Sequence, residues 1–320
     1  MTNTITDVPG ILVGHAQDEK AGTGCSVVLA ESGAIAGVDV RGGAPGTRET
    51  DCLDPSNFVQ TVHAIYLGGG SAYGLDGATG VMRYLEERQV GLDVGVCRVP
   101  IVPGAVIFDL PVGDCKVRPD AAMGYAACKA ARAEVPQGNV GAGTGASVGK
   151  AAGLSRMMKG GLGTASIRVG DLIVGAIVAV NCYGDVIDVD TGKILAGTLT
   201  ASRDAFADTR AMMRASPAGT DPFASNTTIG VIATNARFTK PQARRIAIMA
   251  HDGMARAINP IHTMYDGDTI FCLATGGVDA DVTIAGALAA EVMAQAIANG
   301  VRNARSAYGL PCHADIGGRA

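Results

Sequence analysis

The residues best suited to chemistry in this chain stand where a polar loop meets an apolar strand. Asn226 and Thr227 lie at this junction, just before the β-branched run 228–235. A threonine hydroxyl is a weak nucleophile unless a base lies beside it, and the α-amine of an N-terminal threonine can be that base. Cleavage between Asn226 and Thr227 would create such an amine, so the pair predicts a self-processing amide hydrolase. The alternative is that Thr227 merely opens a strand, where β-branched residues are favoured.

Four other polar residues are candidates to assist Thr227. Lys150 follows a loop of small residues, where an ammonium can approach a buried site and keep a neighbouring amine neutral. Asn181 ends the apolar run 172–180, where a side-chain amide can donate to an oxyanion. Asp266 and Asp268 flank a glycine and could orient a hydroxyl or an amine. Each also has an ordinary interpretation as an exposed lysine, a turn-starting asparagine or an Asp-Gly turn.

Ser147 offers a rival nucleophile, because residues 145–149 match the Gly-x-Ser-x-Gly pattern of serine hydrolases. Three downstream histidines could complete a triad: His251, His262 and His313. The segment before Ser147 is a glycine-rich loop, whereas this pattern requires a strand there. A serine hydrolase of this kind would remain an intact chain. A non-enzymatic binding or assembly protein is the other alternative class.

The glycine-rich segments do not predict a cofactor. Residues 68–74 could receive an anion at a helix start, but Tyr73 breaks the dinucleotide-binding pattern. Residues 143–151 have Thr144 and Ala151 where a phosphate loop needs Gly and Ser or Thr. The chain has no CxxC pair and no HExxH helix, so neither a metal nor an organic cofactor is expected.

Composition indicates a compact, glycine-rich globular protein. Of the 320 residues, 48% are hydrophobic and 18% charged, with 45 glycines and no tryptophan. The net charge of −4 gives no reason to expect nucleic acid or an anionic membrane as partner. No apolar stretch reaches the about 18 residues that a membrane span needs. The N-terminus lacks a signal-peptide pattern, so we expect a cytoplasmic protein with reduced cysteines.

Hydrophobic spacing predicts interleaved strands and helices. Helices are predicted at 72–87, 120–133, 240–258 and 279–299. Strands are predicted at 25–29, 34–40, 95–99, 106–109, 164–169, 172–181, 186–189, 228–235 and 269–275. Gly170-Asp171 joins two of them as a tight hairpin. Many strands are adjacent hairpins, which favours antiparallel sheets covered by helices. The polar segment 195–226 is the most linker-like part of the chain.

Taken in order, several segments resemble one family. They are 7–10, 14–15, 40–43, 69–75, 105–109, 141–150, 226–229, 234–235 and 262–269. The chain resembles the DmpA/BapA-type aminopeptidases and their relative, the nylon-oligomer hydrolase NylC, over nearly its whole length. No single motif is decisive, but their combination and order are specific.

The resemblance implies an α/β (α+β) fold, a four-layer α-β-β-α sandwich similar to the N-terminal-nucleophile hydrolases. It implies a single catalytic domain, 1–320, that cuts itself into a large subunit, 1–226, and a small subunit, 227–320. The family forms tetramers, so we expect a homo-oligomer of processed heterodimers. Thr227 would be the nucleophile, with four residues at the positions that assist it: Lys150, Asn181, Asp266 and Asp268.

The resemblance also bears on the substrate. The threonine and the aspartate pair resemble the nylon-oligomer hydrolase, whereas the aminopeptidase branch tends to use a serine with a Ser/Glu pair. Peptides and 6-aminohexanoate oligomers are therefore the expected substrates, and release of N-terminal residues by an aminopeptidase/D-esterase is the alternative. The chain departs from the nylon-oligomer hydrolase at Phe108, where that enzyme has a tyrosine. Phe108, Tyr73 and Ser71 are the candidates for substrate binding.

Overall fold

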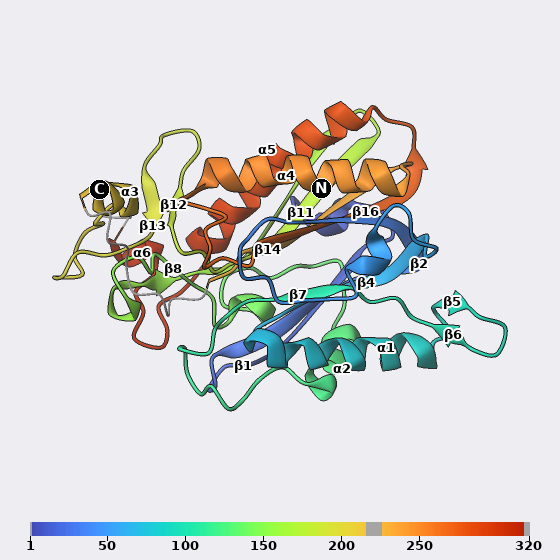
Figure 1. The fold of residues 1–320 in the computed structure, drawn as a ribbon, viewed down its shortest axis with the longest axis horizontal. Helices are drawn as coiled ribbons and strands as arrows, with labels where there is room; N and C mark the ends of the chain where they lie inside the picture. Colours follow the sequence, from blue (N-terminus) through green and yellow to red (C-terminus); the bar gives the residue numbers. More distant parts are fainter. Residues whose placement is uncertain (1, 216–225, 317–320) are drawn as a thin grey trace.

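A nine-stranded mixed sheet organises the protein (Figure 1), seen in a computed structural model that describes residues 2–215 and 226–316. Its strand order is β10-β11-β14-β16-β2-β4-β7-β3, with β1 paired to β2. The strands are β1 (Leu12–Asp18), β2 (Thr23–Val40), β3 (Thr47–Arg48), β4 (Thr61–Gly68), β7 (Gly104–Val106), β10 (Gly161–Val169), β11 (Leu172–Val180), β14 (Ile229–Ala236) and β16 (Thr269–Val278). The pairs β14–β16 and β4–β7 are parallel, which the hairpin-rich sequence did not predict.

The long strand β2 carries the sheet from one layer into a second. Its first part, Cys25 to Leu29, pairs with β1 and β4, whereas its last part, Ile35 to Val40, pairs with β16. The register with β4 shifts after Leu29, as at a β-bulge. Because a bulge bends a strand and increases its twist, the sheet can fold over itself here.

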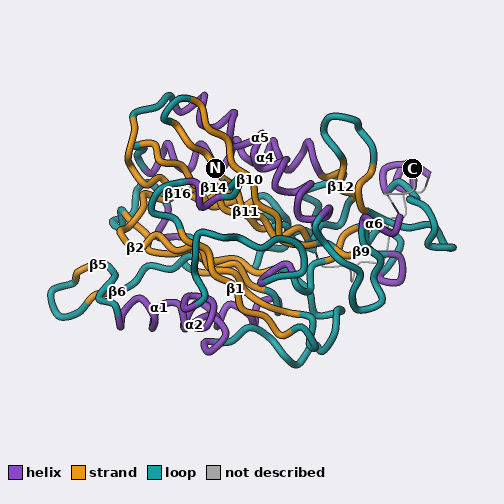
Figure 2. The backbone as a smooth tube through the Cα atoms, turned by 180° about the vertical axis from the view of Figure 1, so that it is seen from behind, coloured by secondary structure: helices purple, strands orange, loops and turns teal. Residues whose placement is uncertain are grey.

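Two helix pairs cover the outer faces of the folded sheet. Helices α4 (Lys240–Ala257) and α5 (Val282–Arg302) lie on one side, and α1 (Gly77–Glu87) and α2 (Ala121–Lys129) on the other (Figure 1). The view from behind shows the strands between the two pairs (Figure 2). The expected four-layer α-β-β-α sandwich is therefore confirmed.

Apolar side chains that alternate between the two faces of each strand form three apolar cores between the four layers of helices and strands. In β14, Val231 and Ala233 face the space between the two β layers, whereas Ile232 faces α4 and α5. In β4, Ile65 faces the same inter-sheet space and Tyr66 faces α1 and α2. This two-residue period is what a strand buried on both faces requires.

Local sequence signals fix the ends of the covering helices. Helix α4 begins after Thr239, which forms a capping box with Gln242. The Asp281 carboxylate caps α5 by accepting from the amides of Thr283 and Ile284. Helix α5 is long and apolar enough to cross a membrane, but 67% of its most apolar window is buried. It packs against α4, β10 and β11, as a core helix does.

Some sequence predictions need correction. Strands predicted at 25–29 and 34–40 are one strand, β2, and the strand at 95–99 is a small hairpin of β5 (Leu92–Asp93) and β6 (Arg98–Val99). The segment from 195 is not a linker up to residue 215, because it contains β13 (Ile194–Ala196) and α3 (Thr209–Ala215). Its remainder, 216–225, lies outside the described residues. The Gly170-Asp171 hairpin is confirmed, with Val169 opposite Leu172.

Three small pairings complete the described elements. Strand β12 (Asp185–Ile187) pairs with β13 and with β15 (Ile258–Asn259), and β8 (Ser147–Val148) pairs with β9 (Met158–Lys159). The short helices are η1 (Ile5–Asp7), η2 (Asp51–Leu53), η3 (Ser71–Asp76), η4 (Gly141–Gly143), η5 (Leu154–Arg156) and α6 (His313–Ile316).

Candidate active site

Strand register brings the candidate residues to one end of the central strands. Strands β11 and β14 are antiparallel with Ala179 opposite Ile229, and two residues further the Thr227 amide donates to the Asn181 carbonyl at 3.0 Å. Strands β14 and β16 are parallel, and a bridge joins Asn226 to Asp266. The end of β11 and the starts of β14 and β16 therefore meet at Thr227.

Thr227 is buried and hydrogen-bonded to the carbonyl that precedes it. Its side chain is 3% exposed, and its Oγ1 donates to the carbonyl oxygen of Asn226. The same oxygen accepts from the amide of Gly267 at 3.0 Å. A hydroxyl and a backbone donor thus converge on one peptide carbonyl oxygen, which places the hydroxyl beside that peptide bond and a donor where an oxyanion would form.

Gly267 is a site residue that sequence reasoning treated only as part of a turn. A Cβ at this position would lie 2.8 Å from Thr227 Oγ1 and 2.6 Å from the carbonyl oxygen of Ala44. Only glycine therefore lets this amide approach the Asn226 carbonyl without displacing the hydroxyl. The Asp-Gly-Asp spacing was the available signal, but it does not reveal which atom lies opposite the glycine.

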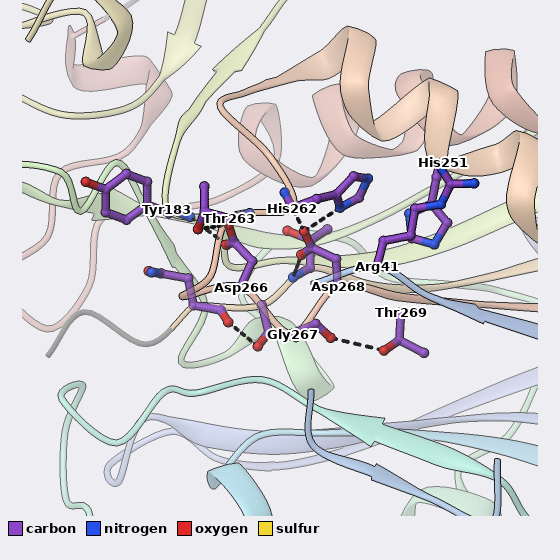
Figure 3. A network of polar contacts seen from close by, with 12 residues as sticks. Arg41, Tyr183, His251, His262, Thr263, Asp266, Gly267, Asp268 and Thr269 are labelled. Atoms are coloured by element: carbon purple, nitrogen blue, oxygen red, sulfur yellow. Dashed lines mark hydrogen bonds and ion pairs between the residues drawn. The ribbon is translucent and has the colours of Figure 1, made fainter. Parts of the chain in front are cut away.

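The two aspartates accept hydrogen bonds from neighbouring backbone amides, and Figure 3 shows Asp266 beside Thr263 and Asp268 beside His262. Asp268 Oδ1 accepts from the Thr228 amide at 2.6 Å. Asp266 Oδ2 accepts from the amide and hydroxyl of Thr263 at 3.0 and 2.6 Å, and its Oδ1 accepts from the Tyr183 amide at 3.3 Å. Burial and the Asp268 charge raise the pKa of Asp266 to about 6. Among the described hydrogen bonds, Asp268 holds the backbone next to Thr227, Asp266 holds Thr263 and Tyr183, and neither carboxylate reaches the Thr227 hydroxyl.

Lys150 and Asn181 form a second buried pair beside Thr227. Lys150 Nζ donates to the Asn181 carbonyl at 3.1 Å and to Asn181 Oδ1 at 3.0 Å. Burial lowers the pKa of Lys150 to about 8, although Cys182 and Asp266 oppose this shift. Asn181 Nδ2 donates to the Phe108 carbonyl at 3.2 Å. In this arrangement the backbone donor described on the Asn226 carbonyl is the Gly267 amide, and the expected oxyanion role of Asn181 stays a prediction.

The alternative triad around Ser147 is not assembled in the described structure. Ser147 lies on the short strand β8, whereas the serine-hydrolase pattern needs a turn between a strand and a helix. Its Oγ donates weakly to Asn181 Oδ1 at 3.5 Å. The three histidines have other partners: His262 pairs with Asp268, His251 with Asp39, and His313 with the Leu195 carbonyl.

Comparison with known proteins identifies the family. The model of peptidase family S58 matches residues 3–314. The chain belongs to this family. An uncharacterized aminopeptidase of Mycobacterium tuberculosis is 47% identical over 98% of both chains. A 6-aminohexanoate-oligomer endohydrolase of Agromyces sp. is 36% identical, over 91% of this chain and 84% of the relative. This S58 peptidase is thus a hydrolase acting on amide or peptide bonds.

Solved structures support the fold. A β-aminopeptidase of Burkholderia sp. superposes with a TM-score of 0.72 at 23% identity, covering 98% of this chain and 92% of the other. The L-aminopeptidase D-Ala-esterase/amidase of Ochrobactrum anthropi gives 0.71 at 18% identity, covering 95% and 86%. The latter is described as a variant among the N-terminal-nucleophile hydrolase folds. The expected relation to that fold is therefore confirmed for this S58 peptidase.

The three substrate-binding candidates lie on two adjacent segments of the S58 fold, η3 and the residues after β7. Phe108 is half-buried, and its carbonyl holds Asn181. Ser71 lies beside it, because the Ser71 amide donates to the Ile107 carbonyl at 3.0 Å. Tyr73 is 64% exposed, with the Arg118 guanidinium 4.0 Å from its ring centre. Their role in binding stays a prediction.

Two buried charged residues near the site carried no clear sequence signal. Lys159 Nζ donates to three backbone carbonyls, those of Gly143, Ala146 and Gly160, at 2.9, 2.8 and 3.1 Å. Burial lowers its pKa to about 7. Asp109 accepts from the Gly70 amide at 2.6 Å, and burial raises its pKa. Within the described residues, no cluster of three or more His, Cys, Asp or Glu side chains could hold a metal.

Proposed function

We propose that this S58 peptidase is a self-processing amide hydrolase with Thr227 as nucleophile. One observation carries the proposal: the Thr227 hydroxyl and the Gly267 amide both donate to the carbonyl oxygen of Asn226, which belongs to the bond to be cut. The hydroxyl is next to its target, and the oxyanion donor is already in place. Family membership supports the reaction class.

Processing would begin when Thr227 Oγ attacks the carbonyl carbon of Asn226 and gives its proton to a nearby base. The negative charge that develops on the carbonyl oxygen would be stabilised by the Gly267 amide. The bond from that carbon to the Thr227 nitrogen then breaks, the base returns the proton to this nitrogen, and the nitrogen leaves as an amine. Water hydrolyses the remaining ester, which gives a carboxylate on Asn226 and a free hydroxyl and amine on Thr227.

The new amine would serve as the base in turnover. The Thr227 nitrogen lies 3.0 Å from the Asn181 carbonyl, which also accepts from Lys150 Nζ at 3.1 Å. A lysine cation that shares an acceptor with this amine would lower the amine's pKa and keep it neutral. The neutral amine could then take the proton from Thr227 Oγ as it attacks the carbonyl carbon of a substrate amide. The substrate C–N bond would break, the protonated Thr227 amine would give its proton to the leaving nitrogen, and the acyl ester left on Thr227 would be hydrolysed by water.

For the substrate, we propose linear amides, either peptides or 6-aminohexanoate oligomers. The oligomer endohydrolase relative at 36% identity supports the second of these. The aminopeptidase relative at 47% identity favours the alternative, an exopeptidase or D-esterase that releases N-terminal residues. Substrates with a free or an acetylated N-terminus separate the two modes, because only an endo-acting enzyme cuts both. A cytoplasmic tetramer of processed heterodimers is part of the proposal and is tested by native mass.

Intact-mass spectrometry under denaturing conditions tests the proposal directly. We expect two fragments that meet between Asn226 and Thr227. A single full-length mass from a preparation that hydrolyses amides would overturn the assignment of Thr227.

A further inference from the structure

His262 contacts the candidate site, yet the proposed reaction assigns it no role. Its Nδ1 lies 2.8 Å from Asp268 Oδ2, and its own backbone amide donates to the same oxygen at 3.1 Å. His262 also adopts a left-handed backbone conformation, with φ of 57°. Non-glycine residues in this region are strained, and such strain concentrates at functional sites. The backbone is therefore strained at the residue whose ring and backbone nitrogens both contact Asp268 Oδ2.

A second histidine packs against the ring of His262. The rings of His251 and His262 lie edge to face, with centroids 4.8 Å apart (Figure 3). His251 is fully buried in its side chain, and its Nε2 bonds to the Asp39 carbonyl at 3.1 Å. The Asp39 carboxylate is in turn held by Arg41 Nε at 2.6 Å. Burial, with His262 nearby, lowers the pKa of His251 to about 4. The ring that packs against His262 is therefore neutral.

We propose that His262 is a positioning residue for Thr227: its Nδ1–H fixes the Asp268 carboxylate, whose other oxygen then holds the Thr228 amide. The inference rests on the proposed function of Thr227. Asp268 Oδ1 accepts a hydrogen bond from the Thr228 amide at 2.6 Å, and the Asn181 carbonyl accepts one from the Thr227 amide at 3.0 Å. These two contacts fix the backbone on both sides of Thr227, and with it the direction of the hydroxyl.

Without the imidazole donor, the Asp268 carboxylate could rotate about its own bond. Oδ2 would keep only the His262 backbone amide, and Oδ1 would no longer be held against Thr228. Small errors in the direction of attack reduce rates strongly, since a displacement of about 1 Å can cost 10²-fold. The loss should therefore appear as slower processing and a lower kcat, with KM little changed.

The donor also affects protonation, which gives a readout that packing alone would not. Among the described residues, the charged or titratable groups around Asp268 and His262 are Asp266, Cys182, His251, Asp39 and Arg41. Burial and the Asp268 charge raise the pKa of Asp266. Without the imidazole donor the Asp268 charge is less compensated, which should raise the pKa of Asp266 further, so the acid limb of the rate profile should move upward.

The test compares two changes of similar shape, His262→Asn and His262→Leu. Asparagine keeps a donor near the Nδ1 position and tolerates the left-handed backbone, whereas leucine has no donor. We expect His262→Leu to slow self-processing by about tenfold or more and to raise the acid limb by about one pH unit. His262→Asn should stay within about threefold of the original rate. The fraction of uncut chain over time and the pH dependence of kcat and KM are measured.

His63→Leu is the matched control. His63 is a buried histidine on β4 whose Nδ1 accepts from the Ile101 amide at 3.2 Å. The His63→Leu substitution should lower the melting temperature without slowing processing. Equal slowing in His63→Leu and His262→Leu at similar melting temperatures would overturn the inference, as would unchanged rate and pH profile in His262→Leu.

Two further outcomes are decisive. If His262→Leu does not fold, a tenfold loss in His262→Asn at an unchanged melting temperature overturns the donor role, and a near-original rate supports it. Thr227→Ala separates the two proposals. An uncut Thr227→Ala protein beside a normal His262→Leu protein rejects the inference alone, whereas a processed Thr227→Ala protein rejects the function beneath it.

Discussion

The two ends of β14 carry the same residue types and differ in everything around them. Asn226 and Thr227 precede the strand, and Thr234 and Asn235 close it. All four are buried. Their chemistry as isolated side chains is the same, so the contrast between the two ends isolates what the surroundings contribute.

At the far end, the polar atoms are satisfied by the backbone of the neighbouring hairpin. Asn235 Oδ1 accepts from the Ile173 amide at 2.8 Å, and its Nδ2 donates to the Asp171 carbonyl at 2.9 Å. Thr234 Oγ1 accepts from the Ala236 amide at 3.2 Å. The Asn235 contacts tie β14 to the neighbouring hairpin and the Thr234 contact lies within β14, so these buried polar groups serve the structure alone.

At the site end, buried charges surround the same residue types. Lys150 is 3% exposed, and Asp266 and Asp268 are fully buried. Burial of a charge is costly unless it is paired, and here it shifts the pKa values of Lys150 and Asp266 towards neutral pH. The reactivity we propose for Thr227 therefore comes from three loops that meet around it, those of Lys150, Asn181 and Asp266 to Asp268. It does not come from the Asn-Thr sequence itself.

The largest predicted difference between the two ends is in the threonines. Thr227→Ala removes the proposed nucleophile, so processing and amide hydrolysis should fall by about 10⁴-fold or more. Thr234→Ala should keep both activities and lose about 1–2 kcal/mol of unfolding free energy through one hydrogen bond and a small cavity. Intact mass, amidase rate and urea unfolding measure these effects. A processed, active Thr227→Ala protein would remove the contrast on which the comparison rests.

The two buried lysines sharpen the comparison inside the site. Lys150→Met removes the cation beside the Thr227 nitrogen, so we expect a loss of about 10²-fold in kcat while the chain stays folded. Lys159→Met leaves three buried carbonyls without their donor, so we expect a loss of about 2–4 kcal/mol in stability. Thermal unfolding and single-substrate kinetics separate the two outcomes. A Lys159→Met protein of normal stability with a tenfold lower kcat would place Lys159 in the reaction.

The sequence predicted most of the elements around these residues because period and end signals are local. The hairpin at Gly170-Asp171 and the helices α4 and α5 follow from turn residues, caps and apolar stripes. The single strand β2 could not be predicted in this way. Its bulge after Leu29 and its passage between two layers depend on partners β4 and β16, which lie far along the chain.

The same holds for the site: the sequence indicates which residue types could react, but not which groups lie next to one another in space. Thr227 and Asn181 were named because they border apolar runs, and the two aspartates because they flank a glycine before a strand. Strand register then brought these strand ends together. Gly267 was assigned no role and His262 was considered only as a partner of Ser147, because a backbone amide and a second contact to a carboxylate leave no pattern in one sequence. They become visible only when the Asn226 carbonyl and Asp268 have neighbours in space.

At the site end, Asp266 should make both the rate of processing and the stability of the protein depend on pH. Its pKa is raised from 3.8 to about 6 by burial and by Asp268. Processing should therefore rise by about tenfold from pH 5 to pH 7 as Asp266 ionises and balances Lys150. Stability should change in the opposite direction. Between about pH 4 and 6 the unfolded chain binds fewer protons than the folded one, so the free energy of unfolding falls by up to roughly 1.4 kcal/mol for each pH unit of increase.

Asp266→Asn is the variant that tests this assignment. It keeps an acceptor for Thr263 but cannot ionise, so the rate should lose its dependence on pH near 6 and stability should vary less between pH 4 and 6. Urea unfolding at several pH values and a processing time course give both readouts. An unchanged acid limb in Asp266→Asn would move the titration to another group.

The smallest effect on activity is expected from the far-end amide. Asn235→Ala removes two buried hydrogen bonds and leaves the Ile173 amide and the Asp171 carbonyl without partners, so stability should fall by about 2–3 kcal/mol. Processing should stay within twofold, because the strand that links the two ends is held along its length by β11 and β16. Asn181→Ala is the matched change at the site end, and it should reduce processing by at least about tenfold, because the Asn181 side chain holds Lys150. If Asn235→Ala slowed processing as much as Asn181→Ala at equal stability, the two ends of β14 would be coupled. The view that reactivity comes only from the loops around Thr227 would then be wrong.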